Sequence, residues 1–184
     1  MSISDYEFWF IVGSQFLYGP EVLETVAGRA AEMAAELNAS GDLPCKLVYK
    51  GTVKTNGEAT DLVRQANYDP RCAGIVTWCH TFSPSKMWIN GLAALQKPWC
   101  HLATQYNRDI PNDEIDMDFM NLNQAAHGDR EHGFLEGHRR LLAGRGGTPP
   151  PGQLDASRRG RGLLPLPEGD ALRGQHAGGG GHRG

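Results

Sequence analysis

Apolar and polar positions along the chain follow two different periods. Four short apolar runs, rich in β-branched and aromatic residues and bounded by turn residues, predict strands near residues 7–12, 45–49, 72–78 and 99–104. Between them, apolar residues recur three and four positions apart, which predicts helices near 20–37, 57–67 and 84–95. Because parallel strands need crossover helices, the alternation predicts the fold class α/β, with a doubly wound (Rossmann- or flavodoxin-like) parallel sheet.

Each of the first two predicted helices has one apolar face, and capping residues mark where predicted helices begin. One face of the first helix holds Val22, Val26, Ala30, Met33 and Leu37, and one face of the second holds Ala59, Leu62, Val63 and Ala66. Asn56 is expected to cap the second helix, and Ser83 the third, with Pro84 at its first helical position. Past Gln105 the pattern weakens: 107–120 mixes polar residues with isolated apolar ones, and 122–134 resembles the start of a helix.

The strand near 72–78 is apolar on both faces and is followed by a loop of polar and aromatic residues. Open α/β sheets bind ligands at the carboxyl ends of such strands. Gly13-Ser14-Gln15 follows the first strand, but without G-x-G-x-x-G spacing the backbone cannot approach a pyrophosphate, which argues against NAD or FAD.

Six residues form a candidate binding set, and its amides and imidazoles suit the hydroxyl groups of a sugar because they both donate and accept hydrogen bonds. They are Gln15, Tyr18, His80, Phe82, Gln124 and His127. The first four lie on loops leaving strand ends and are expected to line one cleft. The alternative for each residue is structural: Phe82 in the core, and His80 hydrogen-bonded to a loop carbonyl.

Three blocks, in this order, resemble the N-terminal part of L-arabinose isomerase. They are Gly13-Ser14-Gln15-Phe16-Leu17-Tyr18-Gly19-Pro20-Glu21, the stretch Trp78 to Leu92, and Ile115 to Gly128. The resemblance covers about residues 1–135, well under half of a complete isomerase.

The resemblance implies a function: conversion of L-arabinose to L-ribulose in arabinose catabolism, a metal-assisted aldose-ketose isomerisation that typically uses Mn²⁺. It implies substrate-binding roles for Gln15, Phe82, Gln124 and His127, at a site formed between subunits of a homo-oligomer. In the family, the catalytic glutamates and metal-binding histidines belong to later domains. We therefore expect no catalytic residue in this chain, no metal bound by it alone, and no activity on its own. The alternative is a non-catalytic small-molecule binding or interaction module.

Acidic residues at 113, 114, 116 and 118, with His101, His127 and His132 nearby in sequence, match no metal-ligand spacing. Asp- and Asn-rich loops are usually solvated turns, so these residues add no metal site to the prediction.

Composition changes after Leu135. Residues 136–184 contain no Ile, Val, Met, Phe, Tyr, Trp, Cys, Lys or Asn, and are expected to form a disordered Gly/Arg/Pro-rich tail after a domain at 1–135. Three explanations of the tail remain open: a functional Arg/Gly segment, a solvated linker, and the product of a lost reading frame in a GC-rich gene. The lost reading frame is the leading hypothesis. The tail holds eight Arg and four acidic residues, a net charge of +4, so residues 1–135 must carry −7 to give the net charge of −3 for the whole chain.

An acidic body argues against nucleic acid as a partner. The four cysteines show no C-x-x-C pairing and are expected to be reduced and buried. Because neither a signal-like segment nor a long apolar run is present, we expect a soluble, cytoplasmic protein without membrane attachment.

Overall fold

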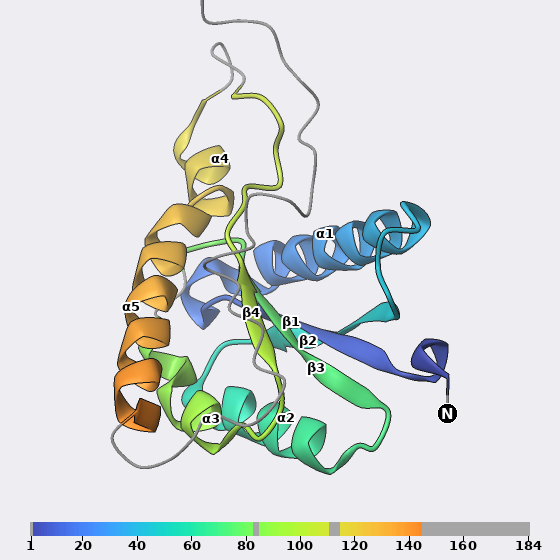
Figure 1. Cartoon of the computed structure of the whole chain (residues 1–184). Coiled ribbons are helices and arrows are strands. Elements are labelled where there is room, and N and C mark those ends of the chain that lie inside the picture. Colours follow the sequence, from blue (N-terminus) through green and yellow to red (C-terminus); the bar gives the residue numbers. More distant parts are fainter. Residues whose placement is uncertain (1, 83–84, 111–114, 145–184) are drawn as a thin grey trace, which may run out of the picture. The chain divides into compact units, whose positions relative to one another are not determined.

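Four parallel strands form one sheet in the computed structural model, which describes residues 2–82, 85–110 and 115–144, with side chains to Leu135 (Figure 1). The strands are β1 (Glu7–Gly13), β2 (Lys46–Val53), β3 (Cys72–Cys79) and β4 (Trp99–Leu102). Their order is β2-β1-β3-β4, with all three neighbouring pairs parallel. The predicted strands and their parallel pairing are therefore confirmed.

Helices connect successive strands, as parallel neighbours require. The connecting helices are α1 (Gly19–Ala39), α2 (Asn56–Tyr68) and α3 (Ile89–Ala94), and α4 (Met117–Leu122) and α5 (Ala125–Gly144) follow the last strand. Short 3₁₀ turns are η1 (Ile3–Asp5), η2 (Phe16–Tyr18) and η3 (Ser85–Trp88). The third predicted helix is divided into η3 and α3, and the expected cap Ser83 and Pro84 lie outside the described residues.

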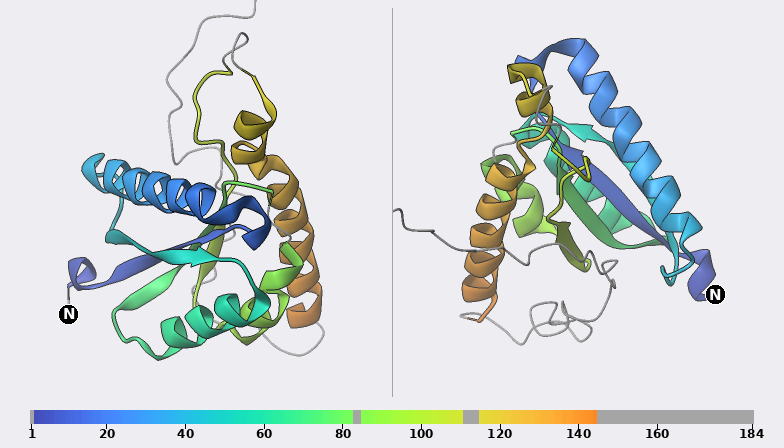
Figure 2. Two further views of the ribbon diagram at one scale, coloured as in Figure 1. Left: turned by 180° about the vertical axis from the view of Figure 1, so that it is seen from behind. Right: turned by 90° about the horizontal axis from the view of Figure 1, so that it is seen from above.

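Both faces of the sheet are covered by helices (Figure 2). Alternation along β1 sends Phe10 and Val12 toward the core under α1, and Trp9 and Ile11 toward the core shared with α2 and η3. The predicted stripe of α1 packs here, with Val26 and Ala30 fully buried and the rest of it half-buried. Helices on both faces of a parallel sheet define the predicted doubly wound class.

Three local expectations are wrong. The N-cap of α2 is Thr55, whose side-chain oxygen accepts a hydrogen bond from the Glu58 amide at 3.2 Å, and Asn56 is already the first helical residue. The second strand extends past its expected end through an irregularity at Gly51, whose φ of 144° favours glycine. Cys100 is exposed, because β4 is the edge strand, whereas the other three cysteines are buried as expected.

The segment from residue 115 onward is more regular than its sequence pattern predicts. Asp116 caps α4 by accepting a hydrogen bond from the Phe119 amide at 2.7 Å. The next helix, α5, continues to Gly144, nine residues past the position at which we expected the folded part to end. Residues 145–184, and with them most of the expected tail, lie outside the described residues.

Within the described ranges, no helix is long and apolar enough to cross a bilayer.

Candidate functional site

The loops after β1 and β3 meet at the carboxyl edge of the sheet. Chain order reverses direction between these two strands, since β2 lies beside β1 on one side and β3 on the other. In doubly wound sheets, this switch point opens a crevice that binds ligands. The two loops are joined by a buried hydrogen bond of 2.8 Å between the Ser14 and Thr81 hydroxyls.

The backbone carbonyl of Phe82 is the main acceptor in this loop pair. Gln15 donates to it from Nε2 at 2.6 Å, and the Tyr18 hydroxyl donates at 3.3 Å. Partial burial of Tyr18 raises the pKa of its phenol, so the hydroxyl remains a donor near neutral pH. The amide oxygen of Gln15 and the half-buried ring of Phe82 are left for other contacts.

Helix α5 brings a third element to the crevice. The ring of the exposed His127 meets the ring of Phe82 edge-on, with centroids 5.3 Å apart and planes at 73°. Gln124 is half-buried and lies just before α5. Its backbone carbonyl accepts a hydrogen bond of 3.4 Å from the His127 amide, which connects it to this group of residues. The structure thus brings Gln15, Phe82 and His127 together, with Gln124 one helical turn away. This placement agrees with the expected site but does not test sugar binding.

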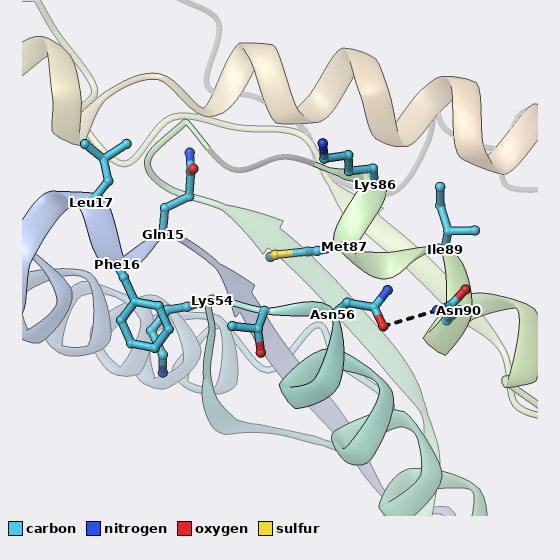
Figure 3. A pocket seen from close by; sticks show the side chains of 10 residues that line it. Gln15, Phe16, Leu17, Lys54, Asn56, Lys86, Met87, Ile89 and Asn90 are labelled. Carbon is cyan, nitrogen blue, oxygen red and sulfur yellow. Dashed lines mark hydrogen bonds between the residues drawn. The ribbon is translucent and has the colours of Figure 1, made fainter.

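A hollow of about 700 Å³ lies beside Gln15 (Figure 3). Its wall combines two lysines, two asparagines and several apolar side chains: Gln15, Phe16, Leu17, Lys54, Thr55, Asn56, Lys86, Met87, Ile89 and Asn90. Asn90 donates to Asn56 at 3.2 Å across it. The size suits a small polar ligand, but Phe82 and His127 do not line this hollow. Gln15 is the point at which it adjoins the crevice.

His80 does not line the crevice, and the expectation that it does is wrong. Its ring is fully buried and stacks on Trp78 with centroids 4.7 Å apart, while Arg29 lies 3.1 Å from its Nε2. Burial, and then the charge of Arg29, lower the pKa of His80 to about 4. A residue two positions after Trp78 continues the same strand face, so His80 lies under α1.

Cys79, His101 and His132 form a buried cluster that the sequence analysis did not identify. One ligand atom from each lies within 4.8 Å of the others. The two imidazole rings are stacked, with centroids 3.9 Å apart and planes at 7°. Imidazole lone pairs lie in the ring plane, so parallel stacked rings do not converge on one ion.

The partners of His101 also argue against a metal in this cluster. Its Nε2 lies 2.8 Å from Asp129, and its Nδ1 lies 2.9 Å from the Thr77 hydroxyl. In addition, a thiolate is a soft ligand, whereas Mn²⁺ prefers carboxylate and carbonyl oxygens. These residues do not fit Mn²⁺, the metal that the resemblance implies.

An open, doubly wound sheet with polar groups at its switch point places this domain in the α/β class, in which ligands bind at that edge of the sheet. Residues 2–145 match the model of one family, the L-arabinose isomerase N-terminal domain. The chain belongs to that family.

Curated relatives bear the same name. The chain is similar to "L-arabinose isomerase" from Thermotoga petrophila (55% identical over 141 residues) and from Herpetosiphon aurantiacus (56% over 141 residues), in both cases over 77% of this chain and 28% of the relative. It is 58% identical over 136 residues to "L-arabinose isomerase" from Klebsiella pneumoniae, over 73% of this chain and 27% of that relative.

Two facts follow about extent. The chain spans little more than a quarter of the length of these relatives. The family match reaches residue 145, one residue past the end of α5 at Gly144 and ten past the position 135 suggested by the sequence blocks.

Proposed function

We propose that this chain is the sugar-binding N-terminal part of an L-arabinose isomerase, which converts L-arabinose to L-ribulose. The observation that carries the proposal is the match of residues 2–145 to the N-terminal domain of that family, at about 55% identity to named isomerases. The complete enzyme, not this chain alone, performs the reaction. Its sites are shared between subunits of a homo-oligomer.

The arrangement at the switch point supports a role in binding rather than in proton transfer. Gln15 offers an amide oxygen, His127 an exposed imidazole and Phe82 an apolar ring face, on three different segments. Amide and imidazole groups hydrogen-bond hydroxyls, and an aromatic face packs on the C–H surface of a sugar. The four residues proposed to contact the sugar are Gln15, Phe82, Gln124 and His127.

Isomerisation also needs positioned carboxylates and, by family resemblance, Mn²⁺. The cluster of Cys79, His101 and His132 does not suit that ion, for the reasons given above. We therefore assign the metal and the proton-transferring groups to the portion of the enzyme that corresponds to the rest of the relatives' length.

The test uses a chimera in which residues 1–144 are joined, at the matching position, to the remainder of the Thermotoga petrophila relative. His127→Ala in this chimera is expected to reduce ribulose formation while bound Mn²⁺, measured by metal analysis, stays at the level of the parent chimera. His127→Gln is the matched control, because it restores a hydrogen-bonding group. Loss of Mn²⁺ from His127→Ala would show that the histidine serves the metal, and unchanged turnover would remove it from the sugar site.

A further inference from the structure

Helix α5 carries His127 to Phe82, so whatever holds α5 in place also determines the geometry of this contact. The helix packs on η3, β3 and β4. Over residues 125–135, the part of α5 whose side chains are described, the buried residues are Ala125, Gly128 and His132, and Leu135 is half-buried. The large apolar side chain nearby, Phe134, is 74% exposed.

Such a face offers little apolar area. Small residues allow the helix to approach the sheet closely, but alanine and glycine leave few interlocking side chains to resist sliding or rotation. The largest fully buried side chain in this part of α5 is a histidine, so directional polar contacts help to set the axial position of residues 125–135.

Ser85 provides the first set of these contacts, at the start of η3. Its amide donates to the Glu131 carboxylate at 2.7 Å, and its hydroxyl donates to the Gly128 carbonyl at 2.8 Å. The same hydroxyl lies 2.6 Å from His132 Nδ1. One residue thus contacts three positions on two successive turns of α5, Gly128, Glu131 and His132.

His101 provides the second set, from the edge strand β4. Its Nε2 lies 2.8 Å from the Asp129 carboxylate, and its Nδ1 lies 2.9 Å from the Thr77 hydroxyl. Trp99 in turn donates to the Thr77 oxygen at 2.9 Å. Contacts at both ring nitrogens hold the His101 ring in one orientation, stacked on His132.

All α5 partners in these contacts lie within five residues of His127, on the same two turns. Hydrogen bonds within a helix make such a segment move as one body. We propose that Ser85, His101, Asp129, Glu131 and His132, here called the α5 anchor, are positioning residues that hold His127 against Phe82. The part of this inference that concerns sugar recognition rests on the proposed function, but the anchor itself does not.

The test uses the full 184-residue chain and nuclear Overhauser effects (NOEs) between the ring protons of His127 and Phe82. In the Asp129→Ala/Glu131→Ala double variant, we expect the ring-to-ring NOE to be lost and the His127 ring signals to shift. The control is the isosteric Asp129→Asn/Glu131→Gln variant, which keeps an acceptor oxygen at each position and is expected to keep the NOE. The amide spectrum of β1 reports whether the sheet is intact.

An intact sheet with an undiminished NOE in the alanine variant would overturn the proposal. If the double alanine variant does not fold, the single Glu131→Ala variant decides the question against Glu131→Gln: a weakened NOE in the alanine variant alone supports the anchor, and equal NOEs contradict it. Failure of the proposed function has a different signature. A wild-type chimera that forms no ribulose, with the NOE behaving as expected, would reject the sugar site and retain the anchor.

Discussion

Two buried histidines should make the folded state lose stability as the pH falls. Burial lowers the pKa of His132 to about 3, with the neighbouring His101 as the second cause, and lowers the pKa of His80 to about 4. Both rings are almost fully buried. The Nε2 of His132 has no hydrogen-bond partner among the described residues, so a proton there would have no acceptor.

The sign follows from linkage. The unfolded chain protonates both histidines below their ordinary pKa of 6.5, whereas the lowered pKa values keep them neutral in the folded chain until pH 4 to 3. The stability due to the neutral rings is therefore fully present above pH 6.5 and is lost as the pH falls through this window. From pH 6.5 to 5, each histidine removes about 2 kcal/mol, since one pKa unit corresponds to about 1.4 kcal/mol.

The groups facing these rings do not cancel the effect. Arg29 faces His80, and its positive charge disfavours a second one. His132 faces His101, with Asp129 held by His101 and Glu131 held by the Ser85 amide. Together, the two histidines remove about 4 kcal/mol by pH 5, which is comparable to the whole stability of a small domain.

The assay is urea unfolding between pH 7 and 5, monitored by tryptophan fluorescence. The slope of unfolding free energy against pH should fall by about 1.4 kcal/mol per pH unit in His132→Gln, and by the same amount in His80→Gln, since each removes one proton from the linkage. Val63→Ala, a buried change without a titrating group, is the control and should lower stability at every pH without changing the slope. Wild-type slopes in both histidine variants would refute the reasoning.

Two further predictions concern the sheet. A Cβ at Gly74 would come 2.8 Å from the backbone oxygen of Pro98, so Gly74→Ala should lower the free energy of unfolding in urea by about 1–3 kcal/mol. Gly28 in α1 has open space around it, so Gly28→Ala should raise the free energy of unfolding by up to about 1 kcal/mol. Equal effects at the two glycines would contradict this. Ile75→Asp buries an unpaired charge in β3 and should abolish the circular dichroism spectrum of the folded protein. Ile89 is exposed, so Ile89→Asp should change the free energy of unfolding by roughly 0.5 kcal/mol or less. A folded Ile75→Asp protein would refute the assignment of this strand to the centre of the sheet.

Most of the fold was predictable because the apolar runs are strong and local. Val26 and Ala30 in α1, and Val63 in α2, keep the helical period without interruption, so burial and secondary structure give the same answer. Helix α4 was not predicted, since its isolated apolar residues give no stripe and its start depends on one capping carboxylate, Asp116. The sequence pattern did not indicate a long helix here, because the buried positions over residues 125–135 of α5 are small residues and a histidine, which give no apolar stripe.

The site was partly predictable. Gln15 and Phe82 follow strands that topology places side by side, so their contact follows from the doubly wound pattern. The approach of His127 depends on where α5 packs, and no local pattern near residue 127 fixes that position. His80 could have been placed correctly, because the alternation of Trp78 and His80 already assigns both to the face under α1.

The most direct test of the central claim compares ribulose formation from L-arabinose by two proteins, the purified 184-residue chain and the chimera that continues after residue 144. With added Mn²⁺, we predict turnover by the chimera that chelation abolishes, and no turnover by the chain alone. The reason is that the cluster of Cys79, His101 and His132 found among the described residues does not suit Mn²⁺, and our proposal assigns the metal to the rest of the enzyme. Metal-dependent ribulose formation by the 184-residue chain, above a metal-free control, would contradict the account.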